Sequence, residues 1–271
     1  MNKRYTTVLT IAGSDGSGGA GIQADIKTFA ALECFGLSVI TALTAQNTTG
    51  VRSIYPVDAK CIKEQFRGIS EDIAIDAVKI GMLGSISAIK TVASLLRELK
   101  DKPPVILDTV LSSTGGTALL PPQAIPLLKE ELFPLTSLIT PNLPESALLT
   151  GMKYAPSTPE EIEETAAKLL ETGTASVLIK GGHGKGAECR DCLLYDNQFI
   201  WFSSKKIETI NTHGTGCTLS SAIAAFMARG ETTDSAVAKA KTYIDEAIEA
   251  GAAYSSGDGN GPLHHFHHFW Q

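Results

Sequence analysis

The sequence predicts a three-layer α/β fold, in which helices cover both faces of a central, mainly parallel β-sheet and an antiparallel hairpin forms one edge. Short apolar and β-branched runs alternate with segments of helical periodicity, which is typical of successive β-α-β units. Near residue 200, two apolar runs are separated only by the polar stretch Asp196-Asn-Gln198, which predicts a tight turn between antiparallel strands. With 271 residues, 43% hydrophobic and 19% charged, the chain is expected to form one domain over residues 1–271.

Each predicted strand is a short apolar or β-branched run, and each predicted helix is a longer segment between such runs. In chain order the strands occupy residues 6–12, 37–44, 76–80, 105–108, 137–140, 176–180, 192–195 and 199–202. The helices occupy residues 21–32, 86–99, 122–132, 159–172, 218–229 and 233–253. The fourth of these helices has the clearest start, because Thr158 supplies a capping hydroxyl, Pro159 fits the first turn and two acids follow.

The composition indicates a small-molecule partner. A formal net charge of −6 at pH 7 and an isoelectric point near 5.5 argue against binding nucleic acid or an anionic membrane through net charge, but they leave room for a local phosphate pocket. No run reaches the ~18 apolar residues that a transmembrane helix requires. The cysteines are odd in number and scattered, which predicts a reducing cytoplasm rather than a secreted disulfide framework: Cys34, Cys61, Cys189, Cys192 and Cys217.

The strongest chemical signal is a glycine-containing bend, Asn211-Thr-His-Gly-Thr-Gly-Cys-Thr218, that leads into an apolar helix. Glycines allow successive backbone N–H groups to converge on one point, and a helix start adds positive potential, so we expect an anion there. Phosphoryl transfer depends on positioning the reactants and stabilising charge on the moving group, a task that suits Gly214, Thr215 and Gly216. A lone Gly-x-Gly also fits a tight loop-to-helix turn that binds nothing.

Cys217 lies at the start of the same helix, where the pKa of a thiol is generally lowered. As a thiolate it would serve as a general base. As a small apolar side chain it would instead fill space beside the loop, which is the usual role of a partly buried free cysteine. The sequence leaves both roles open.

The glycine-rich loop over residues 13–21 lies between the first predicted strand and the first predicted helix. It lacks a clean Gly-x-Gly-x-x-Gly fingerprint with an acidic residue about twenty positions later, and the chain contains no Gly-x-x-x-x-Gly-Lys-Ser/Thr. We therefore expect this loop to form a wall of the substrate pocket. Asp25, one helical turn beyond Gly21, is expected either to bind a ligand hydroxyl or amine, or to be a solvated helix acid.

Further motifs extend over essentially the whole chain. They are Thr10-Ile-Ala-Gly-Ser-Asp15, Gly18-Gly-Ala-Gly-Ile-Gln-Ala-Asp25, Thr41-Ala-Leu-Thr-Ala-Gln-Asn-Thr48, Lys79-Ile-Gly-Met-Leu83, Thr140-Pro-Asn-Leu-Pro-Glu145, Ile179-Lys-Gly-Gly-His183 and Thr212-His-Gly-Thr-Gly-Cys-Thr218. Together they resemble the hydroxymethylpyrimidine/phosphomethylpyrimidine kinases of thiamine biosynthesis, a branch of the ribokinase-like superfamily. The resemblance implies a ribokinase-like αβα sandwich, ATP and Mg²⁺ as cofactors, and a homodimer.

The same resemblance implies roles for individual residues. The wall of the pyrimidine pocket is expected to contain Gly13, Asp25, Gln46, Met82, Val110 and Cys217. Nucleotide contacts are expected from Lys180, Asn142 and Thr212, and Mg²⁺ with its waters is expected at Glu145 and Asp108. Without the resemblance, Asn142 would also fit as a turn residue after Pro141, and Lys180 as a surface lysine at a strand end.

Gln46 is the residue that bears on substrate choice. Its side-chain amide both donates and accepts hydrogen bonds, which suits a ring nitrogen and an exocyclic amine of an aminopyrimidine. Relatives that act on pyridoxal tend to lack this glutamine. The implied reaction is ATP-dependent phosphorylation of 4-amino-5-hydroxymethyl-2-methylpyrimidine, first to its monophosphate and then to its diphosphate, with Cys217 as the candidate base.

One stretch departs from the family pattern. Where the family commonly reads Asp-Pro-Val-Met, this chain has Asp108-Thr-Val-Leu111, so a proline and a methionine are replaced by Thr109 and Leu111. Without the proline the backbone that carries Val110 is less rigid, and we expect substrate fit to be affected there. The bend over residues 212–218 is not expected to change.

Two other hypotheses about function remain: a pyridoxal/pyridoxine kinase on the same scaffold, and a non-catalytic regulator that binds a ligand. Two local features are interpreted as structural. The single Cys189-Arg-Asp-Cys192 has no partner pair and is expected to be a loop entering a strand. The tail over residues 263–270, where histidines alternate with aromatic residues, is expected to dock against the body of the protein.

Overall fold

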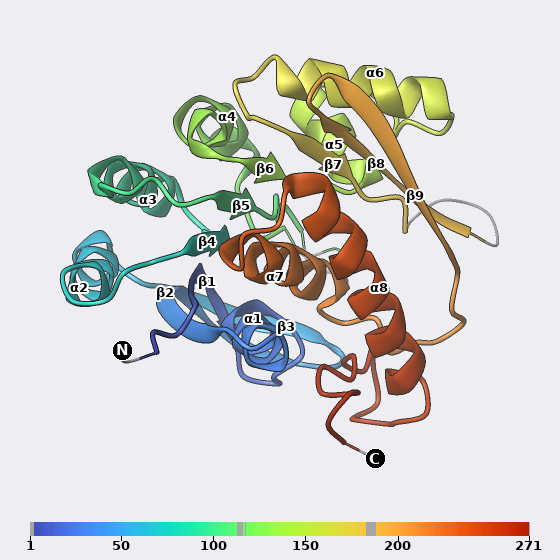
Figure 1. Ribbon diagram of the computed structural model, residues 1–271, viewed down its shortest axis with the longest axis horizontal. Helices are drawn as coiled ribbons and strands as arrows, with labels where there is room; N and C mark the ends of the chain where they lie inside the picture. Colours follow the sequence, from blue (N-terminus) through green and yellow to red (C-terminus); the bar gives the residue numbers. More distant parts are fainter. Residues whose placement is uncertain (1–2, 113–115, 117, 183–187, 271) are drawn as a thin grey trace.

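The computed structural model describes residues 3–112, 116, 118–182 and 188–270 (Figure 1). The strands span Thr7–Asp15 (β1), Phe35–Asn47 (β2), Gly50–Pro56 (β3), Ala77–Ile80 (β4), Val105–Leu107 (β5), Leu138–Ile139 (β6), Val177–Ile179 (β7), Glu188–Tyr195 (β8) and Gln198–Lys205 (β9). The α-helices span Gly21–Ala31 (α1), Ala59–Ser70 (α2), Ile86–Glu98 (α3), Ile125–Glu131 (α4), Leu143–Thr150 (α5), Pro159–Leu170 (α6), Thr215–Ala228 (α7) and Thr233–Gly251 (α8). None of these helices combines the length and the apolar character that crossing a bilayer demands.

The strands form one sheet in the order β3-β2-β1-β4-β5-β6-β7-β8-β9. Neighbouring strands from β2 through β1 and β4 to β7 run parallel. The pairs β2–β3, β7–β8 and β8–β9 are antiparallel. The mainly parallel sheet with an antiparallel edge hairpin is therefore confirmed, and a second hairpin, β2–β3, forms the opposite edge.

Helices cover both faces of this sheet, as predicted. Figure 1 shows α2, α3 and α4 on one face and α1, α7 and α8 on the other. Successive side chains of a strand point to opposite faces. On β5, Val105 and Leu107 pack with the layer that contains α2 and α3, whereas Ile106 packs with the layer that contains α7 and α8. Burial on both faces explains why the strands appear in the sequence as continuous apolar runs.

Three elements are missing from the sequence prediction. Strand β3 has no buried residue, and helix α2 buries only Ile62 and Phe66, so neither gives a strong apolar pattern. Helix α5 begins with a capping box, in which Asn142 and Glu145 each bond the backbone N–H of the other at 2.8 and 2.9 Å. The Asn-x-x-Glu spacing is a recognised helix start, and it is the signal from which α5 could have been predicted.

The carboxyl ends of the parallel strands meet at one edge of the sheet, which is where open α/β sheets bind ligands. Residues at or just beyond these ends come from five different strands. They are Gly13 in β1, Met82 after β4, Asp108 after β5, Asn142 after β6 and Lys180 after β7. The topology thus gathers side chains that are up to 167 positions apart in the sequence.

The C-terminal tail docks against α7 and α8, as predicted. His265 Nε2 lies 3.0 Å from Thr218 Oγ1, and Tyr243 Oη donates a hydrogen bond to the His265 carbonyl oxygen at 2.7 Å. Leu263, His264 and His265 are all buried. The tail therefore packs directly behind the first turns of α7.

Candidate active site

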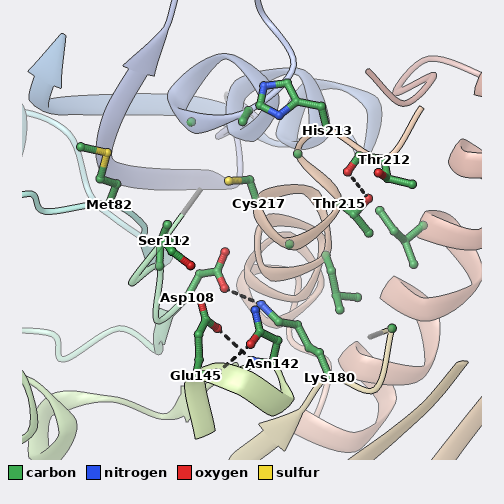
Figure 2. A pocket seen from close by; sticks show the side chains of 18 of the residues that line it. Met82, Asp108, Ser112, Asn142, Glu145, Lys180, Thr212, His213, Thr215 and Cys217 are labelled. Carbon is green, nitrogen blue, oxygen red and sulfur yellow. Dashed lines mark hydrogen bonds and ion pairs between the residues drawn. The ribbon is translucent and has the colours of Figure 1, made fainter. Parts of the chain in front are cut away.

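A cavity of about 670 Å³ opens at the carboxyl edge of the sheet. Figure 2 shows the start of α7 in its centre, with Met82 to one side and Lys180, Asp108 and Glu145 to another. All but one of the residues predicted for the site line this cavity. They are Gly13, Gln46, Met82, Asp108, Val110, Asn142, Glu145, Lys180, Thr212, Gly214, Thr215, Gly216 and Cys217.

The bend before α7 is open toward the cavity. Gly214 has a φ of 87°, in the left-handed region that favours glycine, and a Cβ there would lie 1.8 Å from the Gly19 carbonyl oxygen. Thr215 Oγ1 donates to the Thr212 carbonyl oxygen at 2.7 Å and ties the bend to the helix. First-turn N–H groups have no acceptor within their own helix. The amides of Gly216 and Cys217 can therefore bind an anion in the cavity.

A buried ion pair lies beside Gly216. Lys180 Nζ is 2.7 Å from Asp108 Oδ1, and Thr140 Oγ1 donates to the same oxygen at 3.1 Å. Burial alone would raise the pKa of Asp108, but the positive charges of Lys180 and Lys79 hold that pKa below its ordinary value. A Cβ on Gly216 would lie 3.3 Å from Lys180 Nζ and 3.4 Å from Asp108 Oδ2. Both charges thus border the start of α7.

Glu145, another buried carboxyl group of the cavity, is held by the residues that depart from the family pattern. Thr109 Oγ1 donates to Glu145 Oε2 at 3.3 Å, and the Leu111 amide donates to Glu145 Oε1 at 3.4 Å. The Asn142 amide supplies a third hydrogen bond, to Oε2 at 2.9 Å. A proline in place of Thr109 would offer no hydroxyl to this carboxylate. The departure therefore adds a contact to Glu145.

The two carboxyl groups differ in their titration. Burial raises the pKa of Glu145 to about 6; the positive charge of Lys180 opposes this rise and the negative charge of Asp108 adds to it. Glu145 therefore changes charge near neutral pH, while Asp108 stays ionised. Carboxylate oxygens are the ligands that Mg²⁺ prefers, so this pair has the donor atoms that the ion needs.

On the other side of the cavity, Gln46 is tied to the bend through His213. The Gln46 side-chain amide is 3.1 Å from His213 Nε2, and the same nitrogen is 2.9 Å from Asp15 Oδ2. Burial would raise the pKa of Asp15, but hydrogen bonds from His213 and Ser17 bring it down to about 2, so Asp15 can only accept. The His213 Nε2 atom must then carry a hydrogen that Asp15 accepts. The Gln46 side-chain nitrogen lies beside this pair, while the Gln46 amide oxygen accepts from Thr44 Oγ1 at 3.3 Å. Thr44 and His213 thus position the Gln46 side chain.

Comparison with known proteins decides the family. Residues 15–264 match the family described as phosphomethylpyrimidine kinase, which is most of the chain. This chain belongs to the phosphomethylpyrimidine kinase family. The resemblance stated from the sequence motifs is therefore confirmed.

Individual relatives agree with this assignment. The chain is 46% identical to a hydroxymethylpyrimidine/phosphomethylpyrimidine kinase of Rhizobium meliloti, with 97% of this chain and 98% of the relative covered. It is 45% identical to a thiamine biosynthesis bifunctional protein of Geobacter sulfurreducens, with 96% of this chain and 52% of that protein covered. The crystal structure of an ADP complex of Bacillus subtilis pyridoxal kinase has a TM-score of 0.88 at 35% identity and covers 97% of this chain and 98% of that chain. The ribokinase-like fold class is confirmed as well.

Within this phosphomethylpyrimidine kinase fold, the predicted position of Asp25 in the pocket wall is wrong. Its carboxylate lies behind the wall, where it accepts hydrogen bonds from Thr10 Oγ1 at 2.6 Å and from Ser221 Oγ at 2.7 Å. Lys79 Nζ contacts both carboxylate oxygens at 2.8 and 2.9 Å, and both side chains are fully buried. Asp25 therefore neutralises a buried lysine, and its oxygens are taken up by protein donors.

The predicted lowering of the Cys217 pKa is also wrong. Burial raises the pKa of this thiol to about 11, and the positive charge of Lys79 only partly offsets the rise. The carboxylates of Asp25 and Asp108 push the pKa further in the same direction. The favourable potential of the helix start is therefore outweighed, and Cys217 is a neutral thiol at neutral pH.

For several residues in or near the site, the sequence alone did not predict a role. Asp15, Lys79 and His213 lie inside the motifs quoted above, but spacing does not reveal which partners they meet. Lys241 in α8 lies outside every motif. Its Nζ is 2.9 Å from Asp191 Oδ2, and Asp191 Oδ1 accepts from the Gly181 amide at 2.7 Å. This buried pair fixes the backbone that follows Lys180.

The remaining candidates are structural or outside the described chain. Cys189 and Cys192 both lie in β8, within a strand rather than in a loop entering one, and both are free thiols. Burial raises the pKa of Cys189 to about 11 and that of Cys192 to about 12. His183, which belongs to one of the sequence motifs, lies outside the residues that the structure describes.

Proposed function

We propose that this chain transfers the γ-phosphoryl group of ATP to the hydroxymethyl oxygen of 4-amino-5-hydroxymethyl-2-methylpyrimidine, and then a second one to the phosphate of the product. These would be two successive steps of thiamine biosynthesis. One observation carries the proposal: the first turn of α7 lines a single cavity together with Gln46 and Lys180. An acceptor and a nucleotide phosphate can therefore meet at the backbone amides of that turn.

At the nucleotide side, Lys180 would neutralise charge on the ATP phosphates, with Asn142 and Thr212 as further contacts. The amides of Gly216 and Cys217 would hold the moving phosphoryl group, since the Thr215 amide already donates to the Thr212 carbonyl oxygen. In this reaction the acceptor oxygen forms a bond to the γ-phosphorus while the bond from that phosphorus to the bridging oxygen of ADP breaks. The Lys180 ammonium and the helix start support the proposal because both offer positive charge where negative charge accumulates.

We propose that Asp108 and Glu145 hold Mg²⁺, in part through water. Both carboxyl groups face the cavity next to Lys180, and their oxygen atoms suit a hard cation. When bound, the ion would neutralise charge on the β- and γ-phosphates. Protonation of Glu145 near its pKa of about 6 would weaken this site.

At the acceptor side, Met82 and Val110 offer apolar contacts to a flat ring. A Cβ on Gly13 would lie only 3.3 Å from Met82 Sδ, so glycine keeps this part of the wall close to the ring. Gln46, held beside His213, would bond the edge of the pyrimidine. This polar contact supports an aminopyrimidine as the acceptor.

We propose Cys217 as the base that takes the hydroxyl proton. Its side chain lies in the cavity at the start of α7 and points toward the Met82 side in Figure 2. Only the thiolate can accept the proton, and a pKa of about 11 makes that form scarce at neutral pH. The proposal therefore requires a rate that rises with pH.

The direct test is formation of ADP with and without hydroxymethylpyrimidine. We expect acceptor-dependent ADP formation by the natural chain and by Lys168→Ala, a control at an exposed lysine on α6. Lys180→Ala should lower kcat/KM by about 10²-fold or more, because it removes a charge on the transferring group. Folded protein that forms no acceptor-dependent ADP would refute the proposed function.

A pyridoxal kinase activity is the second candidate, and the structural similarity to the Bacillus subtilis pyridoxal kinase favours it. Substrate comparison of the natural chain with Gln46→Met distinguishes the two. Loss of the amide should weaken use of the pyrimidine relative to pyridoxal, since a buried hydrogen bond to the ring is lost. Competitive kinetics with an unchanged preference would remove Gln46 from the specificity argument.

We further propose that the chain acts as one kinase domain in a homodimer in the cytoplasm. The paired residues Leu43 on β2 and Tyr55 on β3 support the dimer, because they leave 51% and 61% of their surface exposed side by side at the sheet edge. The five free thiols support a reducing compartment. Light scattering of the purified chain would give the mass of the assembly and test the dimer.

A further inference from the structure

The C-terminal tail carries a group of metal-ligand side chains that the kinase reaction does not use. Glu246 of α8 and the tail residues His267 and His268 each offer one ligand atom, and these atoms all lie within 4.8 Å of one another. None of the three lines the active-site cavity. The group therefore needs an explanation separate from phosphoryl transfer.

In the neutral form of His267, the ring nitrogen Nε2 is a hydrogen-bond acceptor that faces another acceptor, the Glu246 carboxylate. His267 Nδ1 lies 3.1 Å from the His264 carbonyl oxygen, which can only accept, so Nδ1 carries the hydrogen. In the neutral ring, the lone pair is then on Nε2, and this atom faces Glu246 Oε2 at 3.2 Å. The ring cannot easily turn away, because its side chain is only 7% exposed and it packs against Tyr243. Either an additional proton or a cation must lie between these two atoms.

A second imidazole converges on the same oxygen. His268 Nε2 is 3.3 Å from Glu246 Oε2, and the two histidine rings are 4.1 Å apart at their centroids. In a tetrahedral zinc site with bonds of about 2.0–2.1 Å, neighbouring ligand atoms are about 3.3 Å apart. The two nitrogen-to-oxygen distances match that separation. A carbonyl bonded to the far nitrogen of a ligating histidine is also the usual arrangement around a bound metal.

We propose that Glu246, His267 and His268 bind a divalent transition metal of the Zn²⁺ type, which joins the C-terminal tail to α8. Two imidazoles and one carboxylate favour Zn²⁺, Co²⁺ or Ni²⁺ over Mg²⁺, which prefers oxygen ligands only. Half of the Glu246 side chain and of His268 is exposed, so an ion can enter from solvent and keep water as a fourth ligand.

The site would also stabilise the docked tail. Two residues before His267, His265 contacts Thr218 in the first turns of α7, and Tyr243 bonds the His265 carbonyl oxygen. A ligand that binds only the folded chain raises its stability by mass action. Zn²⁺ at about 100 times its dissociation constant should raise the Tm by about 5 °C for a chain of this size.

The test measures metal binding without ATP or pyrimidine, so its result is independent of the proposed kinase function. The full chain is titrated with ZnCl₂ by calorimetry and with CoCl₂ by visible absorption, which distinguishes nitrogen and oxygen ligands from thiolates. We expect one high-affinity equivalent of metal. Affinity should fall by at least about tenfold in Glu246→Gln and in His268→Ala, because each removes one ligand. Glu249→Gln, an exposed acid of the same helix, is the matched control and should bind as the natural chain does.

Two results would overturn the proposal. The first is an absence of stoichiometric binding by the natural chain, which would mean that protonated imidazoles alone pair with Glu246. The second is unchanged affinity in both ligand variants, or a cobalt spectrum with thiolate character, which would locate the metal at the cysteines or in the cavity. Each variant is also checked by its Tm without metal, so that a binding loss in a folded protein is separated from undocking of the tail.

Discussion

At the scale of single residues, buried charges around the start of α7 control one another. Lys79 pairs with Asp25 and Lys180 pairs with Asp108, and no side chain of the four is more than 14% exposed. In a poorly solvated environment each charge acts strongly on its neighbours. The pKa of Cys217 therefore depends on burial and on these charges, and the helix start alone does not determine it.

The proposed base can be tested by the pH dependence of kcat. If the Cys217 thiolate takes the proton, its fraction grows about tenfold per pH unit below a pKa of about 11, and kcat should rise in parallel between pH 7 and 9. Cys217→Ala should lower kcat by about 10²-fold or more, flatten this rise and leave the Kd for ATP unchanged, because the backbone amides remain. A flat profile of the natural chain above pH 7 would exclude Cys217 as the base.

Glu145 predicts an acidic limit to activity. As the pH falls through about 6, its carboxylate becomes protonated and loses the charge that the proposed Mg²⁺ site needs, so kcat/KM should fall. Glu145→Gln should remove this limb and raise the Mg²⁺ concentration needed for half-maximal rate. Glu161→Gln is a matched control, because Glu161 fills the same capping-box position in α6 but is exposed. The same acidic limb in Glu145→Gln would show that another group titrates there.

We expect substitution of Asp25 to lower the free energy of unfolding rather than to weaken substrate binding. Asp25→Ala leaves the Lys79 ammonium buried without its partner, which should cost about 3–5 kcal/mol of unfolding free energy, measured by urea denaturation. The double variant Asp25→Asn/Lys79→Met removes both charges and should recover part of that loss. If Asp25→Ala were stable but had a raised KM for the pyrimidine, the result would instead show that Asp25 contacts the substrate.

At the scale of elements, the start of α7 combines two glycines with different tasks. Gly214 provides a positive φ and lies against the Gly19 carbonyl oxygen, whereas Gly216 lies in the first turn beside Lys180 and Asp108. The first is needed to form the bend and the second to leave room in it. Substitution of Gly214 by alanine therefore tests the stability of the fold, and substitution of Gly216 by alanine tests phosphate binding.

Gly214→Ala should destabilise the chain by more than about 1–2 kcal/mol, because alanine resists that φ and its Cβ meets a carbonyl oxygen. Gly216→Ala should keep or raise the Tm, since alanine favours a helix over glycine by about 0.5–1 kcal/mol. Its methyl group should nevertheless crowd the Lys180 and Asp108 side chains and reduce kcat/KM for ATP. Thermal unfolding and kinetics of both variants check this contrast. Full activity of a folded Gly216→Ala would argue against phosphate binding at this turn.

The sequence predicts elements well where burial is continuous and poorly where it is sparse. Strands such as β5 and β7 pack on both faces, so their apolar runs were visible, and the two strongest glycine loops were found. Strand β3 and helix α2 bury too little to give a pattern. Helix α5 was missed although Asn142 and Glu145 carry a capping-box signal, because the proline before them suggested a turn.

At the scale of the whole molecule, topology explains why most of the cavity residues could be expected. Gly13, Met82, Asp108, Asn142 and Lys180 lie at or just beyond the carboxyl ends of parallel strands, and these ends must meet. Pairings across the sheet could not be predicted in the same way. Whether Asp25 faces the cavity or Lys79 depends on the packing between α1, α7 and β4. The sequence around Asp25 alone does not predict this orientation. The Lys241–Asp191 pair depends likewise on how α8 lies against β8.

The central claim is that the start of α7 brings a phosphoryl group to a pyrimidine held by Gln46. The most direct measurement supplies hydroxymethylpyrimidine and pyridoxal together, at equal concentration with ATP and Mg²⁺, and follows the phosphorylated products over time by mass spectrometry. We predict pyrimidine monophosphate first and its diphosphate later, with at least about tenfold less pyridoxal phosphate. Pyridoxal phosphate as the main product, or no phosphorylated pyrimidine at all, would contradict this account.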